Sequence, residues 1–396
     1  MESQFHIMNL REEFPITRRL VYLNSASTGA VPASTIRLLR DYMEERCRWM
    51  GGEEWLEGGD RWSKMAEESR RLFAEIIGAC EDEVAFIPNT TTGINTALSM
   101  IPMRRGQNIV ATSISYPMGA IVSLKQRERG VEVRFAENRN GIVELEEFER
   151  LIDDETAAVL VDQAGWYNGL IHDIRSIAEM AHDHGAYLVV DAVQSAGALR
   201  LRADADGIDF LAVSTYKWLL GGPYSQTVGF LYINREHIDS FQPPFVGNQS
   251  IDEDQLQANI YDRFDLYDLN YRRGIRRLQI YPRYEMAYVA VGNSMKILLR
   301  EGLEKIERRI KGLGTILIEG LLDSGFELQT PVDEERRLFV NVKVRDNRRL
   351  EAELYSRKIA VSARVGGLRI SPHLYNSEED IEALLMELRA LKGATM

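Results

Sequence analysis

Short apolar runs alternate with amphipathic stretches between about residues 84 and 233. Apolar runs of about four to eight residues are typical of buried strands, and apolar residues every three or four positions are typical of helices. The predicted strands are EVAFI, NIVATS, VEVRFA, AAVLVDQ, AYLVVDAV, DFLAVSTY and TVGFLYI. Between them, PMGAIVSLKQRERG, ELEEFERLIDD and IRSIAEMAHDHG carry the helical pattern. This alternation predicts an α/β fold, doubly wound around a mostly parallel seven-stranded sheet.

The pattern changes after this region. Residues 241–283 are polar, rich in aromatic residues and weakly periodic, which indicates an extended loop region with short helices. A helical pattern returns at 284–325, and RLFVNVKV, a helix, GLRISPH and a last helix follow it. We therefore expect an N-terminal segment (1–30) that lines a cleft and packs on the small domain, a large domain (31–283), and a smaller C-terminal α+β domain (284–396).

Composition narrows the class of protein. The chain has 396 residues and a formal net charge of −12, which disfavours nucleic acid or an anionic membrane as the main partner. The N-terminus lacks the apolar core of a signal peptide, and no apolar run is long enough to cross a bilayer. Cys47 and Cys80 are the only cysteines, which fits a reducing compartment. The sequence predicts a soluble, cytoplasmic protein.

A lysine at a predicted strand end is the first candidate for chemistry. Lys217 lies in VSTYKWLLGGP and is the only lysine between Lys125 and Lys296. The carboxyl ends of parallel strands are where doubly wound sheets bind ligands, so Lys217 stands where a Schiff base to a carbonyl compound would form. The alternative is a lysine that only marks where the strand reaches solvent.

Two polar residues at the end of AYLVVDAVQ suit a cationic ring. Asp191 would keep the ring nitrogen of pyridoxal phosphate protonated, and Gln194 would donate to the phenolic oxygen of that ring. An aspartate at a strand end is also a common cap of the next helix. Tyr116 follows another predicted strand, where its ring stacks on a cofactor or serves only in packing.

The segment IPNTTTGIN opens a helix directly after the first predicted strand. Thr90 and Thr91 present hydroxyls and backbone N–H groups at the positive end of the helix dipole, which favours a phosphate. Ser214 and Tyr216 lie just before Lys217 and offer further donors. The alternative is an ordinary threonine-rich helix cap.

These motifs, in this order, resemble the class V aminotransferase family, which includes cysteine desulfurases, selenocysteine lyases and isopenicillin N epimerase-like proteins. The resemblance runs from VYLNSASTGAVP to LRISPHLYNSEEDI and so covers nearly the whole chain. It implies fold type I of the pyridoxal phosphate enzymes, a pyridoxal 5′-phosphate cofactor, an amino acid substrate and a homodimer.

The resemblance also assigns roles to the matching positions. Lys217 matches the lysine that holds the cofactor, and Arg369 in LRISPHLYN matches the arginine that binds the substrate α-carboxylate, a role that suits a planar bidentate donor. The remaining positions match cofactor contacts: Asp191 at the ring nitrogen, Gln194 at the phenolic oxygen, Tyr116 on the ring, and Thr90, Thr91, Ser214 and Tyr216 at the phosphate.

The chain departs from the family pattern at three places. The segment AVSARVGGLRIS has no cysteine where desulfurases carry their nucleophile. Gly274 and Ile275 stand where relatives often have Gly-Thr against the partner subunit's phosphate, and Arg276 is either a substitute or part of a solvated basic turn. VDQAGWYNG has Asp162 and Gln163, and no histidine, ahead of its tryptophan.

We therefore expect a pyridoxal phosphate enzyme with aminotransferase-type chemistry on an amino acid. A C–S lyase or an amino acid epimerase without a cysteine nucleophile is the alternative, and a non-catalytic scaffold is the third reading. We expect no metal site, because His182 and His184 are two positions apart on a predicted helix and no other His/Cys group has ligand spacing.

Overall fold

The computed structural model describes residues 10–48, 61–252, 255, 270–280 and 284–391. Its centre is a seven-stranded sheet with the strand order β2-β8-β7-β6-β5-β3-β4. The strands are β2 (Val84–Ile87), β3 (Asn108–Thr112), β4 (Glu132–Ala136), β5 (Thr156–Asp162), β6 (Tyr187–Asp191), β7 (Phe210–Ser214) and β8 (Gly229–Ile233). Every pair among β4, β3, β5, β6 and β7 is parallel, and β8 runs antiparallel to both of its neighbours. The predicted sheet is confirmed.

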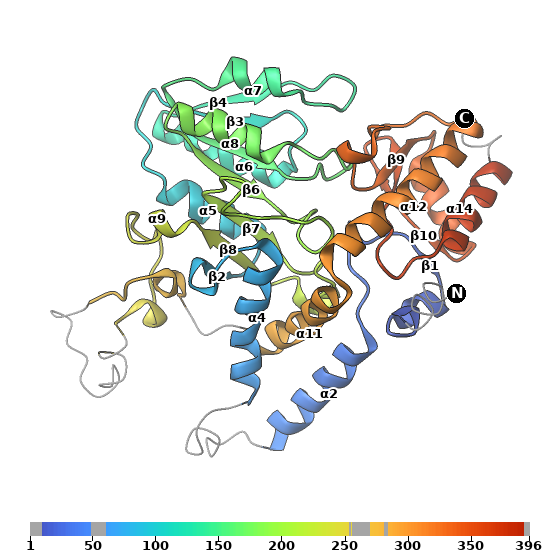
Figure 1. Ribbon diagram of the computed structural model, residues 1–396, viewed down its shortest axis with the longest axis horizontal. Helices are drawn as coiled ribbons and strands as arrows, with labels where there is room; N and C mark the ends of the chain where they lie inside the picture. Colours follow the sequence, from blue (N-terminus) through green and yellow to red (C-terminus); the bar gives the residue numbers. More distant parts are fainter. Residues whose placement is uncertain (1–9, 49–60, 253–254, 256–269, 281–283, 392–396) are drawn as a thin grey trace.

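Helices cover both faces of this sheet (Figure 1). Alternate strand residues belong to different cores: Val110 and Val190 pack in one, and Ile109 and Val189 pack in the other. The first core is closed by α4 (Arg61–Ile77), α7 (Leu145–Leu151), α8 (Ile174–Asp183) and α11 (Glu285–Glu301). The second is closed by α5 (Thr90–Met100), α6 (Pro117–Lys125) and α9 (Arg235–Ile238). Burial on both faces explains why these strands read as continuous apolar runs.

A second, smaller core lies in the C-terminal part of the chain. Its elements are α12 (Leu303–Asp323), β9 (Val340–Lys343), α13 (Asn347–Ser356), β10 (Ile359–Ala360), β11 (Ser362–Arg364), β12 (Gly367–Ile370) and α14 (Glu378–Ala390). Strands β11, β12 and β9 form an antiparallel sheet in that order. The helical stretch expected at 284–325 divides into α11 and α12 at Gly302, whose φ of 87° only glycine adopts readily.

The N-terminal segment lies against both parts. Strand β1 (Val21–Tyr22) pairs in parallel with β10, and Leu23 packs in the C-terminal core. The chain then passes the large sheet, where the Gly29 N–H donates to the Tyr216 carbonyl at 2.8 Å, and continues into α2 (Ala33–Arg48). In Figure 1 the N-terminal segment, in blue, lies beside the orange and red C-terminal elements. The domain boundary near residue 283 stays a prediction.

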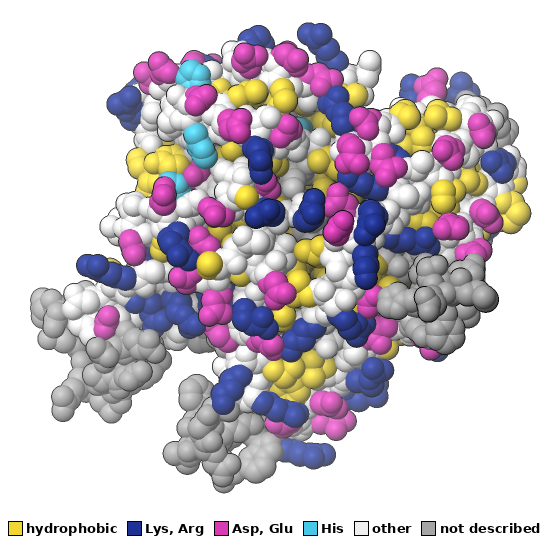
Figure 2. All heavy atoms as spheres, in the orientation of Figure 1, with side chains coloured by type: hydrophobic (Ala, Val, Ile, Leu, Met, Phe, Trp, Pro, Cys, Tyr) yellow, Lys and Arg dark blue, Asp and Glu magenta, His cyan; other side chains and the backbone are white. Residues whose placement is uncertain are grey.

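The loop region expected at 241–283 lies only partly within the described residues. The part that is described forms two short 3₁₀ helices, Asn248–Ser250 and Ile275–Leu278. Among the described helices, none is both long enough and apolar enough to span a bilayer. On the face drawn in Figure 2, acidic and basic side chains are interspersed.

Candidate active site

Lys217 is buried just beyond the carboxyl end of β7, with 7% of its surface exposed. Its Nζ atom lies 5.6 Å from the Tyr116 ring centroid and 5.5 Å from that of Tyr216. Burial and the positive charge of Arg369 lower the pKa of Lys217 to about 7, although two nearby aspartates act in the opposite direction. The amine is therefore far easier to deprotonate near neutral pH than a solvated lysine.

Two aspartates end neighbouring parallel strands beside this lysine. Asp191 ends β6 and Asp162 ends β5, and the two residues are paired in register. Burial raises the pKa of Asp191 to about 6, while its bond from the Val193 N–H (2.9 Å) and the charge of Lys217 oppose the rise. Asp162 accepts the Tyr116 N–H at 2.8 Å, and burial together with the Asp191 charge raises its pKa well above the ordinary value.

Asp162 is a buried residue of this edge that was not predicted as a site residue from the sequence. The sequence does contain a pattern that indicates its position: AAVLVDQ and AYLVVDAV both end their apolar runs in aspartate. Neighbouring parallel strands end at the same edge of a sheet, so the two aspartates are expected to lie side by side.

The start of α5 and the end of β7 form one hydroxyl-rich corner. The Thr90 N–H donates to Ser214 Oγ at 2.8 Å, and the Thr90 and Ser214 hydroxyl oxygens are 2.9 Å apart. Asn89 caps α5 by accepting the Thr92 N–H at 2.9 Å. Gly93 permits the close approach, because a Cβ there would lie 2.7 Å from the Cβ of Ala212 on β7. The corner offers hydroxyls and a helix N-terminus to an anion.

The other predicted cofactor contacts lie around the same edge. Thr91 and Tyr216 are half-buried. The Tyr116 ring packs edge-on against Trp166, with 5.6 Å between the ring centroids. The Gln194 side chain already makes two hydrogen bonds within the protein. Its Nε2 donates to the Ala26 carbonyl at 3.1 Å, and its Oε1 accepts from Trp218 Nε1 at 2.8 Å. Only the second amide hydrogen of Gln194 remains for a ring oxygen.

Arg369 reaches this edge from β12 and is only 2% exposed. Its Nη1 donates to the Trp166 carbonyl at 2.5 Å, and its Nη2 donates to Ser27 Oγ at 2.6 Å. Its Nε has no partner, and no carboxylate of the described residues lies within ion-pair distance of it. Burial and the charge of Arg364 lower the pKa of Arg369 to about 9. A guanidinium in this state suits an incoming carboxylate.

Two of the departures from the family pattern can be located in the structure: the turn before Arg369 and the segment around Gly274. Strands β11 and β12 are joined by Val365 and Gly366 alone, so the cysteine-bearing loop of desulfurases is replaced by a tight turn. Arg276 Nη2 donates to Glu67 Oε1 at 2.5 Å within the same chain. Gly274 has a φ of 77°, a conformation that favours glycine.

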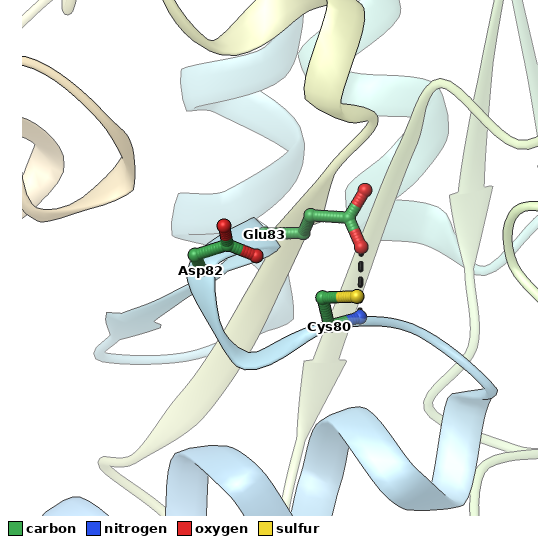
Figure 3. Close-up of side chains that lie close together, drawn as sticks. All are labelled: Cys80, Asp82 and Glu83. Atoms are coloured by element: carbon green, nitrogen blue, oxygen red, sulfur yellow. Dashed lines mark hydrogen bonds between the residues drawn. The ribbon is translucent and has the colours of Figure 1, made fainter.

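A separate group of metal-type ligands lies away from Lys217. Figure 3 shows Cys80, Asp82 and Glu83 around one turn. Their possible ligand atoms all lie within 4.8 Å of one another. Glu83 accepts the Cys80 N–H at 2.8 Å and the Arg235 N–H at 3.3 Å, and Asp82 forms an ion pair with Arg235 at 3.2 Å. Glu83 therefore caps the short helix that it belongs to, and Asp82 has a cationic partner. Both carboxylates already have hydrogen-bond donors.

Comparison with known proteins shows the family to which the chain belongs. The family profile described as Aminotransferase class-V matches residues 21–384. An uncharacterized aminotransferase of Bacillus subtilis, YcbU, is 27% identical over 96% of this chain and 96% of its own length. A probable cysteine desulfurase of Methanothermobacter thermautotrophicus is 25% identical over 97% of this chain and 98% of its own. The solved cysteine desulfurase of Thermococcus onnurineus NA1 superposes with a TM-score of 0.85 at 24% identity, over 98% of each chain.

The fold is that of a fold type I pyridoxal phosphate enzyme. The chain belongs to the class V aminotransferase family, which uses that cofactor. The family, the enzyme class and the cofactor that the sequence predicted are therefore confirmed.

Proposed function

We propose that this protein is a cytoplasmic, homodimeric enzyme that binds pyridoxal phosphate through Lys217 and transfers the amino group of an α-amino acid. One observation carries the proposal: the buried amine of Lys217 lies at a strand edge, within electrostatic reach of the Asp191 carboxylate and of the Arg369 guanidinium, which has no ion-pair partner among the described residues. That combination suits a carbonyl cofactor with a cationic ring and a substrate with a carboxylate.

The residues at this edge fit the cofactor part by part. Thr90, Thr91, Ser214 and Tyr216 would hold the phosphate, since the first and third already meet at the start of α5. The Tyr116 ring would lie on the cofactor ring, with Gln194 at its phenolic oxygen. Asp191 would hold a proton on the ring nitrogen, because it is buried with a single N–H donor bonded to it. When bound, the cofactor supplies an electron sink for the bond broken at the substrate Cα.

Arg369 would bind the substrate, and Lys217 would transfer its proton. Arg369 would bind the α-carboxylate and so fix the direction in which the Cα–H bond points. The Lys217 Nζ atom would then take the Cα proton and return it at a second position, which a pKa of about 7 favours at neutral pH.

A C–S lyase and an epimerase remain the alternative reactions, because both also begin with removal of the Cα proton. Neither reaction would use a cysteine nucleophile of the desulfurase type. Only Val365 and Gly366 lie between β11 and β12, where desulfurases carry that cysteine. The product distinguishes the three reactions. A keto acid formed only with an amino acceptor indicates transamination, release of ammonia indicates elimination, and the D-isomer indicates epimerisation.

Exposed apolar side chains in one stretch support the proposed homodimer. Phe245, Val246, Tyr271, Ile280 and Tyr284 are all more than two-fifths exposed. Large apolar side chains exposed on a single chain are often buried in an interface between chains. Light scattering on the holoenzyme is expected to give twice the 45.2 kDa chain mass.

The decisive experiment is hydride reduction of the holoenzyme, followed by proteolysis and mass spectrometry. We expect the reduced cofactor on the peptide that contains Lys217. Lys125 and Lys296 are both exposed and serve as internal controls in the same digest. An adduct on either control lysine, or no adduct in protein that holds the cofactor, would contradict the proposal.

A further inference from the structure

Arg364 is a second arginine at the site, and neither the motifs nor the proposed mechanism assigns it a role. It ends β11 and is partly exposed. Its Nη1 donates to the carbonyl of its neighbour Ala363 at 2.7 Å, and its Nη2 lies 3.5 Å from Ser27 Oγ. Neither contact involves a negative charge.

The strand register places Arg364 and Arg369 on one face of the small sheet. Ser362 is paired with Arg369, and Arg364 is paired with Gly367. Because side chains alternate along a strand, Ser362 and Arg364 share a face, and Arg369 shares it with them. Gly367, on the same face, has no side chain to separate the two arginines.

Both guanidinium groups converge on one neutral oxygen. Ser27 Oγ is 2.6 Å from Arg369 Nη2 and 3.5 Å from Arg364 Nη2, and it also lies 2.9 Å from Ser362 Oγ. A serine hydroxyl thus occupies a position between two cations, where an anion's oxygen would bind more strongly.

No carboxylate of the described chain neutralises this pair of arginines. No ion pair within 4.0 Å involves Arg364 or Arg369 in that part of the molecule. The acidic residue whose charge acts on Arg369 is Glu351, and its Oε1 accepts the Ala363 N–H at 3.0 Å. The positive charge of Arg364 also reaches Lys217 and helps to lower the pKa of that lysine.

We infer that the substrate is a short acidic amino acid, whose α-carboxylate binds Arg369 and whose side-chain anion binds Arg364. A single carboxylate is satisfied by one bidentate guanidinium, so a second unpaired guanidinium on the same face provides for a second anion. The two guanidinium groups lie close enough to share a hydroxyl, which favours a side chain of one or two carbons, as in aspartate or glutamate. The inference rests on the proposed function, because Arg369 is its α-carboxylate contact.

The test is equilibrium binding to the holoenzyme by calorimetry, with two ligands that cannot lose a Cα proton. 2-Methylaspartate carries a second carboxylate, and 2-aminoisobutyrate is its matched partner without one. The wild-type enzyme is expected to bind 2-methylaspartate at least about tenfold more tightly. Arg364→Gln should weaken 2-methylaspartate binding about tenfold or more and change 2-aminoisobutyrate binding less than about twofold.

Three further variants sharpen the result. Arg369→Ala should weaken both ligands, because both have an α-carboxylate. Arg364→Lys keeps the charge without the planar fork and should give an intermediate affinity for 2-methylaspartate only. Arg349→Gln, an exposed arginine on α13, should change neither affinity.

Equal binding of the two ligands by the wild-type enzyme would overturn the inference. Equal weakening of both ligands by Arg364→Gln would also overturn it, since Arg364 would then share the α-carboxylate. If Arg364→Gln does not fold, the wild-type preference and the Arg364→Lys affinities decide the matter. The proposed function is tested separately: a hydride adduct on Lys217 together with no preference for 2-methylaspartate rejects this inference alone.

Discussion

Asp191 and Asp209 are both buried carboxylates beside the same sheet, but they lie at opposite ends of its parallel strands. Asp191 ends β6 and accepts one hydrogen bond, from the Val193 N–H. Asp209 directly precedes β7 and accepts three: from the Leu188 N–H at 2.7 Å, His182 Nε2 at 2.9 Å and His237 Nε2 at 2.7 Å.

The pKa values of the two aspartates move in opposite directions for this reason. Burial raises the pKa of both carboxyls. At Asp191 the rise persists, to about 6. At Asp209 the hydrogen bonds from His182, His237 and Leu188 outweigh burial, and its pKa is lowered. A buried carboxylate with a complete set of donors stabilises the fold, whereas one with few donors is available to a ligand.

The largest expected effect that tests this contrast is on turnover. Asp191→Asn should lower kcat roughly 100-fold or more, because an amide cannot hold the proton on the cofactor ring. The free energy of unfolding of the cofactor-free protein should stay the same or rise, since a buried and poorly bonded charge is removed. Steady-state kinetics and urea denaturation measure the two quantities. Wild-type turnover in this variant would leave Asp191 as a helix cap only.

Asp209→Asn is expected to give the reverse pattern. Losing charge-assisted bonds at a buried site should lower the free energy of unfolding by about 2–3 kcal/mol, with kcat within about twofold of wild type. Urea denaturation of the cofactor-free protein and steady-state kinetics give the comparison. Glu179→Gln, at an exposed position on α8, is the control and should change neither quantity. A loss of turnover at unchanged stability would contradict the assignment of a stabilising role to Asp209 and a ligand-binding role to Asp191.

A smaller effect is expected at the turn between β11 and β12. Val365 has a φ of 45°, in the left-handed region that a β-branched residue rarely adopts. Val365→Asn should raise the free energy of unfolding by about 1 kcal/mol, because asparagine tolerates this conformation. Thermal and urea denaturation measure the gain. A loss of stability would mean that Val365 makes contacts that outweigh its backbone strain.

The smallest expected effect is the pH dependence of the Asp209 group. Its hydrogen bond to Asp209 raises the pKa of His182, so the stability that His182 contributes is present below pH 6.5 and is lost as pH rises through the higher folded pKa. The contribution of Asp209 has the opposite sign: it is present above pH 3.8 and is lost as pH falls through its lowered pKa. His182 is 43% exposed, so solvent screening keeps its share under about 1 kcal/mol. Denaturation of wild type and His182→Gln between pH 5 and pH 9 should converge at the alkaline end.

The central sheet could be predicted from the sequence because most of its strands are buried on both faces, which leaves a local apolar run such as AYLVVDAV. Lys217, Asp191 and the Thr90 corner then followed from their places at strand ends. Strands β1, β10 and β11 could not be predicted, because two or three residues carry no periodicity and their partners are far away in sequence. Arg364 was overlooked for the same reason: its place at the site depends on the β11–β12 register.

The Asp209 group was also missed, although its members are visible in the sequence. His182, Asp209 and His237 belong to three different elements, and only the packing of α8 and α9 against the start of β7 brings them together. Short-range patterns report which face of an element is buried. They do not report which polar side chains meet across elements.

The pairing of β1 with β10 has a consequence for how the protein is made. Val21 is synthesised long before its partner Ile359, because most of the two domains' elements lie between them in the sequence. The Lys217 carbonyl is packed so closely against Gly29 that a Cβ there would lie 2.0 Å from its oxygen. Strand β1 must therefore remain unpaired until β10 has been made, so this part of the site closes only after that point. Contacts of such long sequence separation also slow folding.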